Sequence, residues 1–312
     1  MPSIWPHLTE TQLGLERKAR PGLIPVQLSA GQAQWIDMNG YHCYEGFFHQ
    51  SLAAYEGLTP SRRQRFTSTL DFLTDPPEDS IRPSGFIFHM GRCGSTLLSK
   101  VLARSRAHLV FSEAAPHNQI WRILPTDKSG DPSRNLEMYR TLLLAMGRPR
   151  LPSYRAHIVK FTSFNIVKFD FIRAAFPGVP ALFLFRDPAH AIDSYRRRNP
   201  SWMGAELGIG KTWHTPEAAI ETFLDAALSI RDPDFQCVDH AHLTPDLLPA
   251  ILRFFHLDPS MEEMRLMASE FAWDAKGGSR PRRFEPALIA TAAVPPHLRE
   301  LYGRAAALKS LR

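Results

Sequence analysis

Five short runs of apolar residues constrain the fold of this chain more than any other feature of its sequence. Each run is bounded by turn or helix signals and fits a strand that is buried on both faces. The runs are Phe86–His89, Leu109–Phe111, Ile158–Phe161, Ala181–Phe185 and Phe235–Val238. Segments with helical spacing lie between most of them. This alternation predicts a parallel sheet with helices on both faces.

The segments between the runs carry helix start and stop signals. From Ser95 onward, apolar residues recur at helical spacing directly after a glycine loop. A second helix is predicted over residues 163–176, where Pro177 and Gly178 stop it. A third begins at Thr215, whose hydroxyl can cap a helix that has proline at its first position. We therefore expect an α/β fold of three layers, in which a central parallel sheet is flanked by helices.

A change in composition near residue 80 divides the chain into two parts. The first eighty residues are rich in proline, glutamine and aromatic residues without a clean period, and Pro76–Ser80 separates them from the region of apolar runs. We expect residues 1–80 to form a lid or packing segment and residues 81–312 to form the main domain. With 312 residues, 44% of them hydrophobic, the chain can bury one large core.

The sequence holds no segment typical of membrane or secreted proteins. Its first residues lack a basic region followed by an apolar stretch, and no long uncharged apolar run follows. The three cysteines, Cys43, Cys93 and Cys237, are an odd and widely spaced set that cannot form a disulfide framework. These features predict a cytoplasmic protein without a membrane span.

The net charge of +6 at pH 7 favours anionic partners. The densest basic clusters are Arg196–Arg198 and Arg280–Arg283, and neither is interleaved with aromatic residues as nucleic-acid-binding surfaces are. We therefore expect no nucleic-acid partner. A small molecule that carries phosphate is the anionic partner that we expect instead.

A glycine-rich loop joins the first apolar run to the helix that begins at Ser95. In Met90–Thr96 the glycines permit tight turns, so that backbone N–H groups and the positive end of the helix can surround a phosphate. A Walker A loop needs glycine at position 89 and lysine at position 95, where this chain has histidine and serine. The sequence therefore argues against a nucleoside triphosphate site. A plain glycine turn between strand and helix is the alternative.

A second motif occupies the junction after the fourth apolar run. Arg186 follows the run, Asp187 can cap the next helix, and Pro188 suits its first position. Ser194 lies two turns further along on the same helical face. An arginine at a strand end and a serine on that face can converge on one phosphate, and the small Ala191 leaves space for it. An ordinary salt bridge of Arg186 is the alternative.

Together the two motifs resemble those of the sulfotransferases. The loop of that family which binds the 5′-phosphate of 3′-phosphoadenosine-5′-phosphosulfate (PAPS) has the same order of residues as Arg92, Cys93, Gly94, Ser95 and Thr96. Arg186 and Ser194 match the pair that binds the 3′-phosphate. The similarity is to soluble bacterial sulfotransferase-like proteins with a P-loop-like fold. It covers residues 85–198, with a weaker similarity over residues 235–284.

The resemblance implies that PAPS is the co-substrate and that a hydroxyl or amine of a small-molecule, glycan or lipid acceptor receives its sulfuryl group. Arg92 stands where the cytosolic animal enzymes have lysine, and Leu97 replaces their aromatic residue. Both departures look closer to the tyrosylprotein and bacterial glycolipid branches. Lys276 and Gly277 are weakly similar to the basic glycine loop that closes over the 3′-phosphate in some members.

The same resemblance suggests catalytic residues. In those two branches a glutamate after the second strand is the general base, and Glu113 holds this position. Arg92 would stabilise charge on the leaving oxygen, and Lys160, at the end of the third run, would face the sulfate or the acceptor. The alternatives are that Glu113 only pairs with an arginine and that Lys160 is an exposed edge residue. His89 and His117 are alternative bases.

Three further expectations concern metals, the acceptor and competing functions. No metal is expected, because arginine, lysine and a helix dipole can supply the positive charge, and Cys237, His240 and His242 lack a standard zinc spacing. The acceptor loops are expected at residues 114–155 and 199–215. Their tryptophans, Trp121, Trp202 and Trp213, suit either interior packing or stacking on an acceptor. A P-loop kinase and a non-catalytic nucleotide-binding module are the competing functions.

Overall fold

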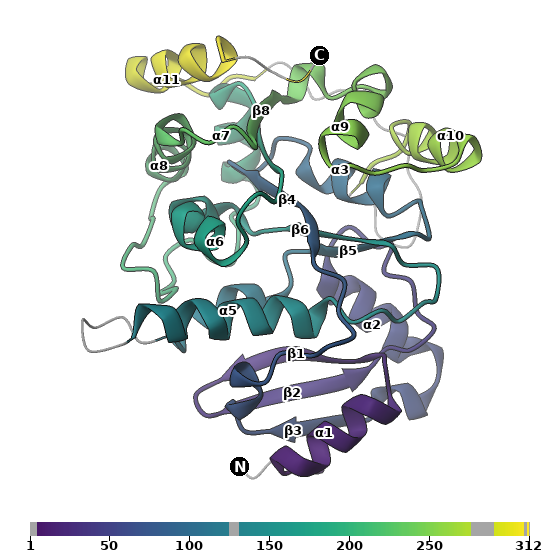
Figure 1. Cartoon of the computed structure of the whole chain (residues 1–312). Coiled ribbons are helices and arrows are strands. Elements are labelled where there is room, and N and C mark those ends of the chain that lie inside the picture. Colours follow the sequence, from purple (N-terminus) through teal and green to yellow (C-terminus); the bar gives the residue numbers. More distant parts are fainter. Residues whose placement is uncertain (1–4, 125–130, 276–289, 309–310, 312) are drawn as a thin grey trace.

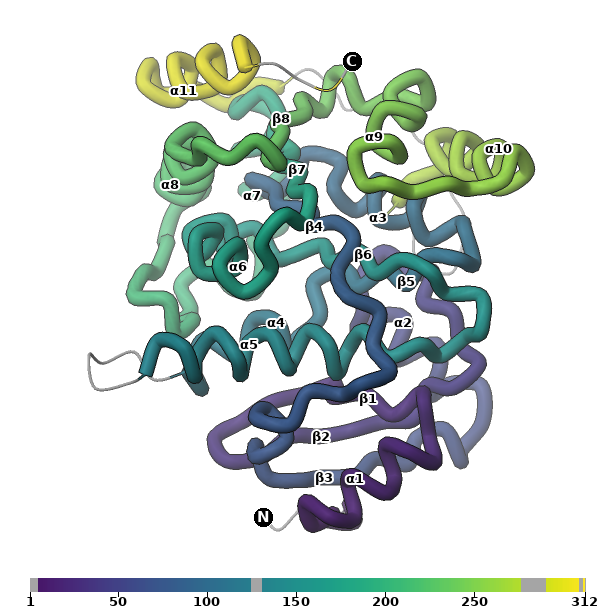
Figure 2. Tube along the Cα trace, viewed as in Figure 1, coloured from purple at the N-terminus to yellow at the C-terminus, as the bar shows by residue number. Residues whose placement is uncertain are grey.

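The computed structural model describes residues 5–124, 131–275, 290–308 and 311. Figures 1 and 2 show a small antiparallel sheet near the N-terminus and a larger central sheet surrounded by helices. Helix α5 (Pro132–Met146) lies between the two sheets and packs on strand β1 of the smaller one and on helix α6 beside the larger one.

The central sheet consists of five parallel strands in the order β5-β6-β4-β7-β8. Their bounds are β4 Pro83–His89, β5 His108–Ser112, β6 Ala156–Lys160, β7 Ala181–Phe185 and β8 Phe235–Asp239. All five occur at the predicted apolar runs, and β5, β6 and β7 are buried along their whole length. The predicted α/β fold is confirmed. The carboxyl ends of its strands share one edge, where open α/β sheets place their ligands.

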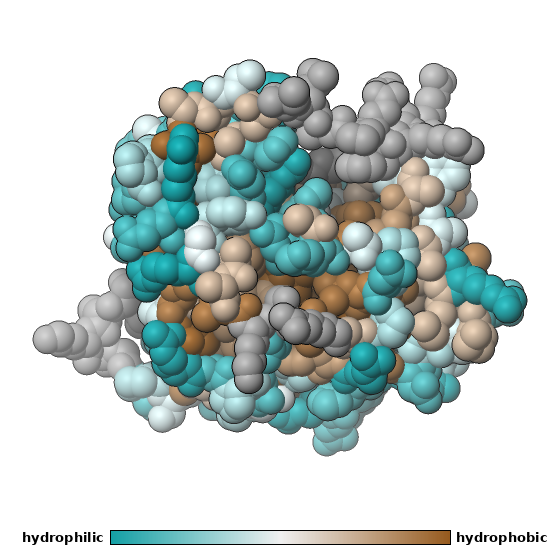
Figure 3. Space-filling model, turned by 90° about the horizontal axis from the view of Figure 1, so that it is seen from above, coloured by the Kyte–Doolittle hydropathy of each residue, from teal (hydrophilic) through white to brown (hydrophobic). Residues whose placement is uncertain are grey.

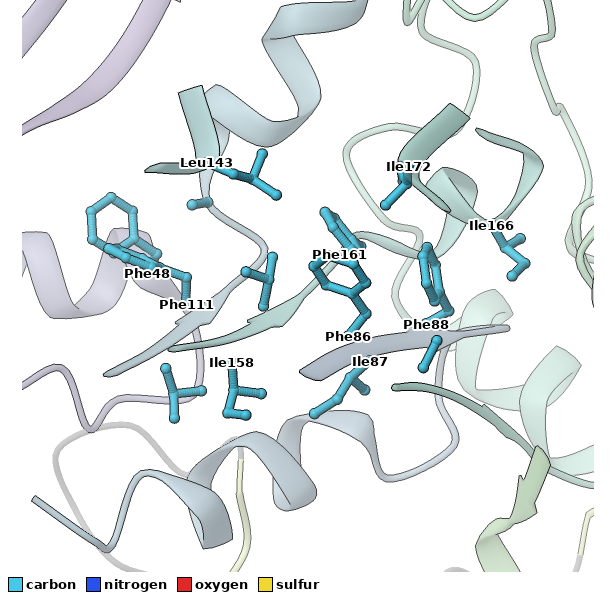
Figure 4. Packing of buried hydrophobic residues seen from close by; sticks show 14 of the residues in the cluster. Phe48, Phe86, Ile87, Phe88, Phe111, Leu143, Ile158, Phe161, Ile166 and Ile172 are labelled. Atoms are coloured by element: carbon cyan, nitrogen blue, oxygen red, sulfur yellow. The ribbon is translucent and has the colours of Figure 1, made fainter. Parts of the chain in front are cut away.

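Apolar side chains fill the space on both faces of this sheet. Phe88 and Phe161 stack with their ring centroids 5.0 Å apart, on the face that α5 covers with Leu143 (Figure 4). Ile87 and Ile158 point to the opposite face (Figure 4), where the helix that follows the glycine loop packs on β4 and β5. The alternation of side chains along each strand therefore uses both faces for core packing.

Helices cover the sheet on both sides, as the alternation predicts. Beyond α5 the main domain has α3 Ser95–Leu102, α4 Ala115–Gln119, α6 Phe169–Ala175, α7 Pro188–Arg197, α8 Pro216–Ser229, α9 Leu248–Phe254, α10 Met261–Glu270 and α11 Pro296–Ala306. Short 3₁₀ turns are η1 Pro60–Arg63, η2 Asp71–Thr74, η3 Ile120–Arg122, η4 Ser163–Lys168, η5 His240–His242 and η6 Pro245–Leu247. No helix in the described ranges is both long and apolar enough to cross a membrane.

The prediction of one continuous helix over residues 163–176 is wrong in its first half. Residues 163–168 form the 3₁₀ turn η4, and the α-helix begins only at Phe169. Both the backbone N–H and the side-chain amide of Asn165 donate to the carbonyl of Thr162, at 2.9 and 3.1 Å. Local bonds of this kind compete with the α-helical pattern, which explains the tighter turn.

Residues 5–80 form a layer that packs on the main domain. Strands β1 Leu23–Ser29, β2 Gln32–Asp37 and β3 Arg65–Ser68 pair in antiparallel fashion, accompanied by α1 Glu10–Ala19 and α2 Phe48–Leu58. Strand β1 packs on α4 and α5, and the buried residues of this layer join the core of the main domain without a break. The two parts of the chain therefore share one hydrophobic core.

Most of the apolar side chains are used in that core. Five large hydrophobic side chains of the described residues are exposed, and they lie on α1, on α2, on α10 and just after α11. Figure 3 shows one face of the molecule, with hydrophilic residues around the rim and hydrophobic residues gathered towards the middle.

Candidate active site

The glycine loop between β4 and α3 has the backbone of an anion-binding turn. Gly91, Arg92 and Gly94 have positive φ angles of 86°, 58° and 84°. Gly94 caps α3 without a side-chain hydrogen bond, and within the described residues no protein group accepts from the N–H groups of Ser95 and Thr96. Unpaired N–H groups at a helix start, together with the helix dipole, favour an anion at this place.

Both glycines of the loop are required by close neighbours. A Cβ atom on Gly91 would lie 1.7 Å from the hydroxyl oxygen of Tyr195, and one on Gly94 would lie 2.9 Å from Cδ2 of His240. The Tyr195 hydroxyl donates to the carbonyl of Met90 at 2.8 Å. Tyr195 of α7 and His240 after β8 therefore help to shape the loop. Sequence reasoning missed both, and the only signal for Tyr195 is its place beside Ser194.

Arg92 and Arg186 lie next to each other at the loop. The Arg92 guanidinium donates to the carbonyl of Arg198 and lies 5.4 Å from the centroid of the Tyr195 ring. Arg186 donates through Nη1 to the carbonyl of Arg92 at 3.4 Å. Burial lowers the pKa of both guanidinium groups from their ordinary value. The structure thus brings Arg186 to the loop, while Arg92 is engaged by the end of α7.

The other residues of the loop motif have clear positions. Cys93 is fully buried, and its Sγ lies 3.1 Å from the carbonyl oxygen of Leu184, so it fills space inside the loop. Ser95 and Thr96 open α3 and are both buried. Lys276 and Gly277 lie outside the described residues.

Lys160 is buried beside the loop. Its Nζ donates to Oγ1 of Thr96 at 3.3 Å and to Oγ of Ser112 at 3.4 Å, and it forms an ion pair with Glu113. The alternative of an exposed edge lysine is wrong, because β6 lies between β5 and β4 and the side chain is 0% exposed. A buried ammonium group therefore touches both the loop helix and the candidate base.

Glu113 follows β5 with a positive φ of 52°. Its partners are Lys160 and His89, whose Nε2 lies 3.5 Å from Oε1, so the expected alternative of an arginine partner is wrong. Burial alone raises the pKa of the carboxyl, but the Lys160 ammonium and His89 hold it well below its usual range. Glu113 is therefore ionised at neutral pH and lies next to the loop.

The two alternative bases differ in their surroundings. His89 ends β4, is buried and contacts Glu113, as described above. His117 lies between the rings of Phe111 and Phe161, and neither of its ring nitrogens has a hydrogen-bond partner among the described residues. Burial lowers its pKa to about 3. His117 is therefore a core residue, and its assignment as an alternative base is wrong.

The start of α7 has the predicted cap and first residue. Asp187 caps α7 by accepting a hydrogen bond from the N–H of Ala189 at 2.7 Å, and Pro188 is at the first helical position. Ser194 is half-buried on this helix, and its hydroxyl makes no hydrogen bond to a described residue. The next residue, Tyr195, binds the loop through its hydroxyl, so this turn of α7 is anchored to the loop.

The N-terminal layer also reaches the site. The carbonyl of Gly46 accepts a hydrogen bond from Oγ of Ser112 at 2.8 Å, and the ring centroid of Phe47 lies 4.9 Å from Nζ of Lys160. The half-buried Phe47 ring therefore covers the Lys160 ammonium. Sequence reasoning missed this contribution, because residues 41–47 have neither a period nor a motif.

The three tryptophans of the expected acceptor loops are buried in the core. Trp121 donates through Nε1 to Asn165 at 2.7 Å, and Trp202 and Trp213 pack against each other with ring centroids 5.9 Å apart. Interior packing is thus the use that the structure gives them. The described residues contain no cluster of histidine, cysteine or carboxylate side chains that could hold a metal, and Cys237 is buried on β8.

Comparison with known proteins gives similarity to solved structures only, since no family model and no curated protein sequence matches the chain. A sulfotransferase from Alicyclobacillus acidocaldarius is 16% identical, with a TM-score of 0.42, over 73% of this chain and 95% of that one. The sulfotransferase domain from the curacin biosynthetic pathway is 16% identical, with a TM-score of 0.41, over 75% and 94%. A mouse sulfotransferase complexed with PAP is 16% identical, with a TM-score of 0.32, over 64% of this chain and 66% of that one. The chain is thus similar to these three sulfotransferases over 64–75% of its own length.

Proposed function

We propose that this chain transfers the sulfuryl group of PAPS to a hydroxyl or amine of a small-molecule, glycan or lipid acceptor. The observation that carries the proposal is the position of Lys160, which touches Thr96 of the loop helix and pairs with Glu113. A cation and a carboxylate thus lie beside an anion-binding loop that has serine in place of the Walker lysine. This arrangement suits transfer without a metal ion better than it suits a kinase.

The described residues fit the two phosphates of PAPS. The unpaired N–H groups of Ser95 and Thr96 suit the 5′-phosphate. Arg186 at the loop and the unbonded hydroxyl of Ser194 suit the 3′-phosphate. Arg92 is the weaker candidate for the 5′-phosphate, because it must first give up the carbonyl of Arg198. The loop amides therefore take the main part in the proposal.

Transfer requires one bond to form and one to break. The acceptor oxygen or nitrogen bonds to sulfur while the bond from sulfur to the 5′-phosphate oxygen breaks, and Glu113 takes the acceptor proton. Lys160 supplies positive charge next to the reacting groups in a buried site, where charge stabilisation is effective. The low pKa of Glu113 makes it a weak base, so it takes the proton when bonding to sulfur has made that proton acidic.

A thermal-shift panel tests the donor assignment. We expect 3′,5′-ADP to stabilise the protein more than ADP or ATP with Mg²⁺, because only its 3′-phosphate satisfies Arg186 and Ser194. A ligand at a hundred times its Kd adds about 2.7 kcal/mol to the free energy of unfolding. Arg186→Ala should remove the difference between 3′,5′-ADP and ADP. Arg196→Ala, on the exposed side of α7 and paired with Glu217, should keep it.

EDTA should leave the shift by 3′,5′-ADP unchanged. Equal shifts for 3′,5′-ADP and ADP in the wild-type protein would refute the donor assignment. A larger shift for ATP with Mg²⁺ would favour a kinase instead.

A further inference from the structure

We propose that His89 is a positioning residue that fixes the glycine loop through one ring nitrogen and Glu113 through the other. This inference rests on the proposed function, since it concerns how the donor loop and the candidate base are held in relation to each other. His89 is the last residue of the central strand β4 and is 4% exposed.

The hydrogen bonds around His89 define a single tautomer. The N–H of Gly91 donates to Nδ1 of His89 at 3.0 Å, so Nδ1 carries a lone pair and no hydrogen. The hydrogen is then on Nε2, which lies 2.9 Å from the carbonyl oxygen of Phe161, a group that can only accept. The same Nε2 lies 3.5 Å from Oε1 of Glu113. A neutral imidazole thus satisfies both sides.

On the loop side, this bond sets the start of the anion-binding turn. Gly91 is the first loop residue with a positive φ, and its N–H is directed to His89 and away from any ligand. The Tyr195 hydroxyl holds the preceding carbonyl of Met90. The Gly91 N–H and the Met90 carbonyl are thus both bonded within the protein, and the N–H groups of Ser95 and Thr96 are left for the anion.

On the other side, His89 helps to hold a strained residue. Glu113 has a positive φ, which costs free energy in a residue other than glycine, and its N–H donates to the carbonyl of Lys160 at 2.8 Å. Its carboxylate pairs with the Lys160 ammonium, and Nε2 of His89, which donates to the carbonyl of Phe161, lies 3.5 Å from its Oε1. The candidate base and the donor loop therefore share one rigid side chain.

Burial favours the neutral form of His89, because it lowers the pKa of the ring. Lys160 from β6 and Glu113 after β5 are the charged groups that face it. Burial lowers the pKa of His89, and the Lys160 charge lowers it further, while Glu113 acts in the opposite direction. A protonated ring would carry a hydrogen on Nδ1, directly opposite the N–H of Gly91. The loop geometry thus requires the neutral form.

Two conservative substitutions separate the two contacts. In His89→Asn the side-chain oxygen reaches the place of Nδ1 and can accept from Gly91, but the side chain at position 89 no longer reaches Glu113, which keeps only its Lys160 partner. In His89→Gln the longer amide reaches the place of Nε2 and leaves Gly91 without its acceptor. His89→Phe removes both contacts at similar size. His108→Asn is the matched control, since His108 is equally buried at the start of β5 and bonds only the carbonyl of Leu102.

We expect affinity for 3′,5′-ADP, measured by calorimetry, to be near the wild-type value in His89→Asn and His108→Asn. It should be about three- to tenfold weaker in His89→Gln and His89→Phe, the usual effect of one hydrogen bond. Exchange of the Gly91 amide hydrogen, followed by NMR without ligand, should be faster in the same two variants. The NMR signal of the Glu113 carboxyl can be identified because it is missing from the spectrum of Glu113→Gln. This signal should titrate at higher pH in His89→Asn than in the wild type.

The outcomes separate this inference from the proposed function. If the wild-type protein does not bind 3′,5′-ADP, the proposed function fails, and the positioning role fails with it. If the wild type binds but His89→Asn and His89→Gln lose affinity equally, or neither changes amide exchange at Gly91, only the role of His89 is overturned. Circular dichroism of each variant checks that it is folded.

Discussion

Glu113 and Lys160 form an ion pair at the carboxyl edge of the central sheet, and each depends on the other. Lys160 is 0% exposed and Glu113 22% exposed, so loss of either charge leaves the other in a poorly solvated place. The low pKa of Glu113 means that this pair stabilises the fold fully above the unfolded pKa of about 4.3. That contribution is lost as the pH falls further below this value.

Glu113→Gln separates the chemical role of this residue from its structural one. The amide keeps the shape but cannot take a proton, so turnover should fall by about 10²–10⁴, while affinity for 3′,5′-ADP survives. The loss of turnover is measured with a true acceptor or by slow hydrolysis of PAPS. Affinity for 3′,5′-ADP is measured by calorimetry. The double variant with Lys160→Met should be less destabilised than the two single changes predict. Affinity that falls in step with turnover would make Glu113 a structural partner of the loop.

The positions of individual site residues could be predicted from the sequence, but their interaction partners could not. Glu113 comes just after an apolar run and Lys160 lies near the end of another, so both could be placed at the edge of the sheet from the sequence. Their pairing depends on the parallel register, in which Ser112 lies opposite Lys160. Register comes from the packing of the whole sheet and leaves no trace in either motif, which is why the sequence offers only arginines as alternative partners for Glu113.

Among the elements, those with strong local signals were predicted and those defined by tertiary contacts were not. The five parallel strands follow from apolar runs, and α7 and α8 from their caps. Strand β1 contains Pro25 next to an irregularity in its pairing with β2, which hides its period. The segment that brings Phe47 to Lys160 is held by Gly46 and Ser112 instead of by a regular element.

Helix α10 is fixed to the loop helix α3 by one buried carboxylate. Glu270 is 1% exposed and pairs with Lys100 at 3.0 Å and with Arg104 at 2.7 Å, both from the end of α3 or just after it. The Tyr44 hydroxyl donates to the same carboxylate at 2.6 Å. This contact therefore joins α10, the loop helix α3 and the N-terminal layer.

Glu270→Gln should destabilise the protein by about 3 kcal/mol, because it leaves two cations beside a buried neutral group. Urea unfolding measures the change. Glu262→Gln on the exposed side of the same helix is the control and should cost less than about 0.5 kcal/mol. Equal losses in the two variants would show that α10 does not depend on this ion cluster.

At the scale of the whole molecule, buried histidines make the fold sensitive to acid. Burial lowers the pKa of His117 to about 3 and that of His157 to about 4. The unfolded chain takes up protons on both near pH 6.5, so below that pH it binds more protons than the folded chain. Each histidine then removes about 1.4 kcal/mol of stability for every pH unit, until the pH reaches its folded pKa.

His117→Leu should therefore stabilise the protein, and more so in acid. The side chain is 0% exposed between two phenylalanine rings without a hydrogen bond, so an apolar residue of similar size removes a buried unsatisfied group. At pH 7 the gain in the free energy of unfolding should be about 1 kcal/mol. At pH 5 the gain should be larger by about 2 kcal/mol, because the substitution also removes the cost of keeping the buried histidine neutral. This cost is about 1.4 kcal/mol per pH unit over the roughly 1.5 units between pH 5 and the unfolded pKa of about 6.5. Urea unfolding at both pH values measures the two gains, and His49→Leu, at an exposed site, should show no such increase. A gain for His117→Leu that is equal at pH 7 and pH 5 would mean that His117 titrates alike in the folded and unfolded chains, and acid sensitivity would then have to arise from the carboxylates.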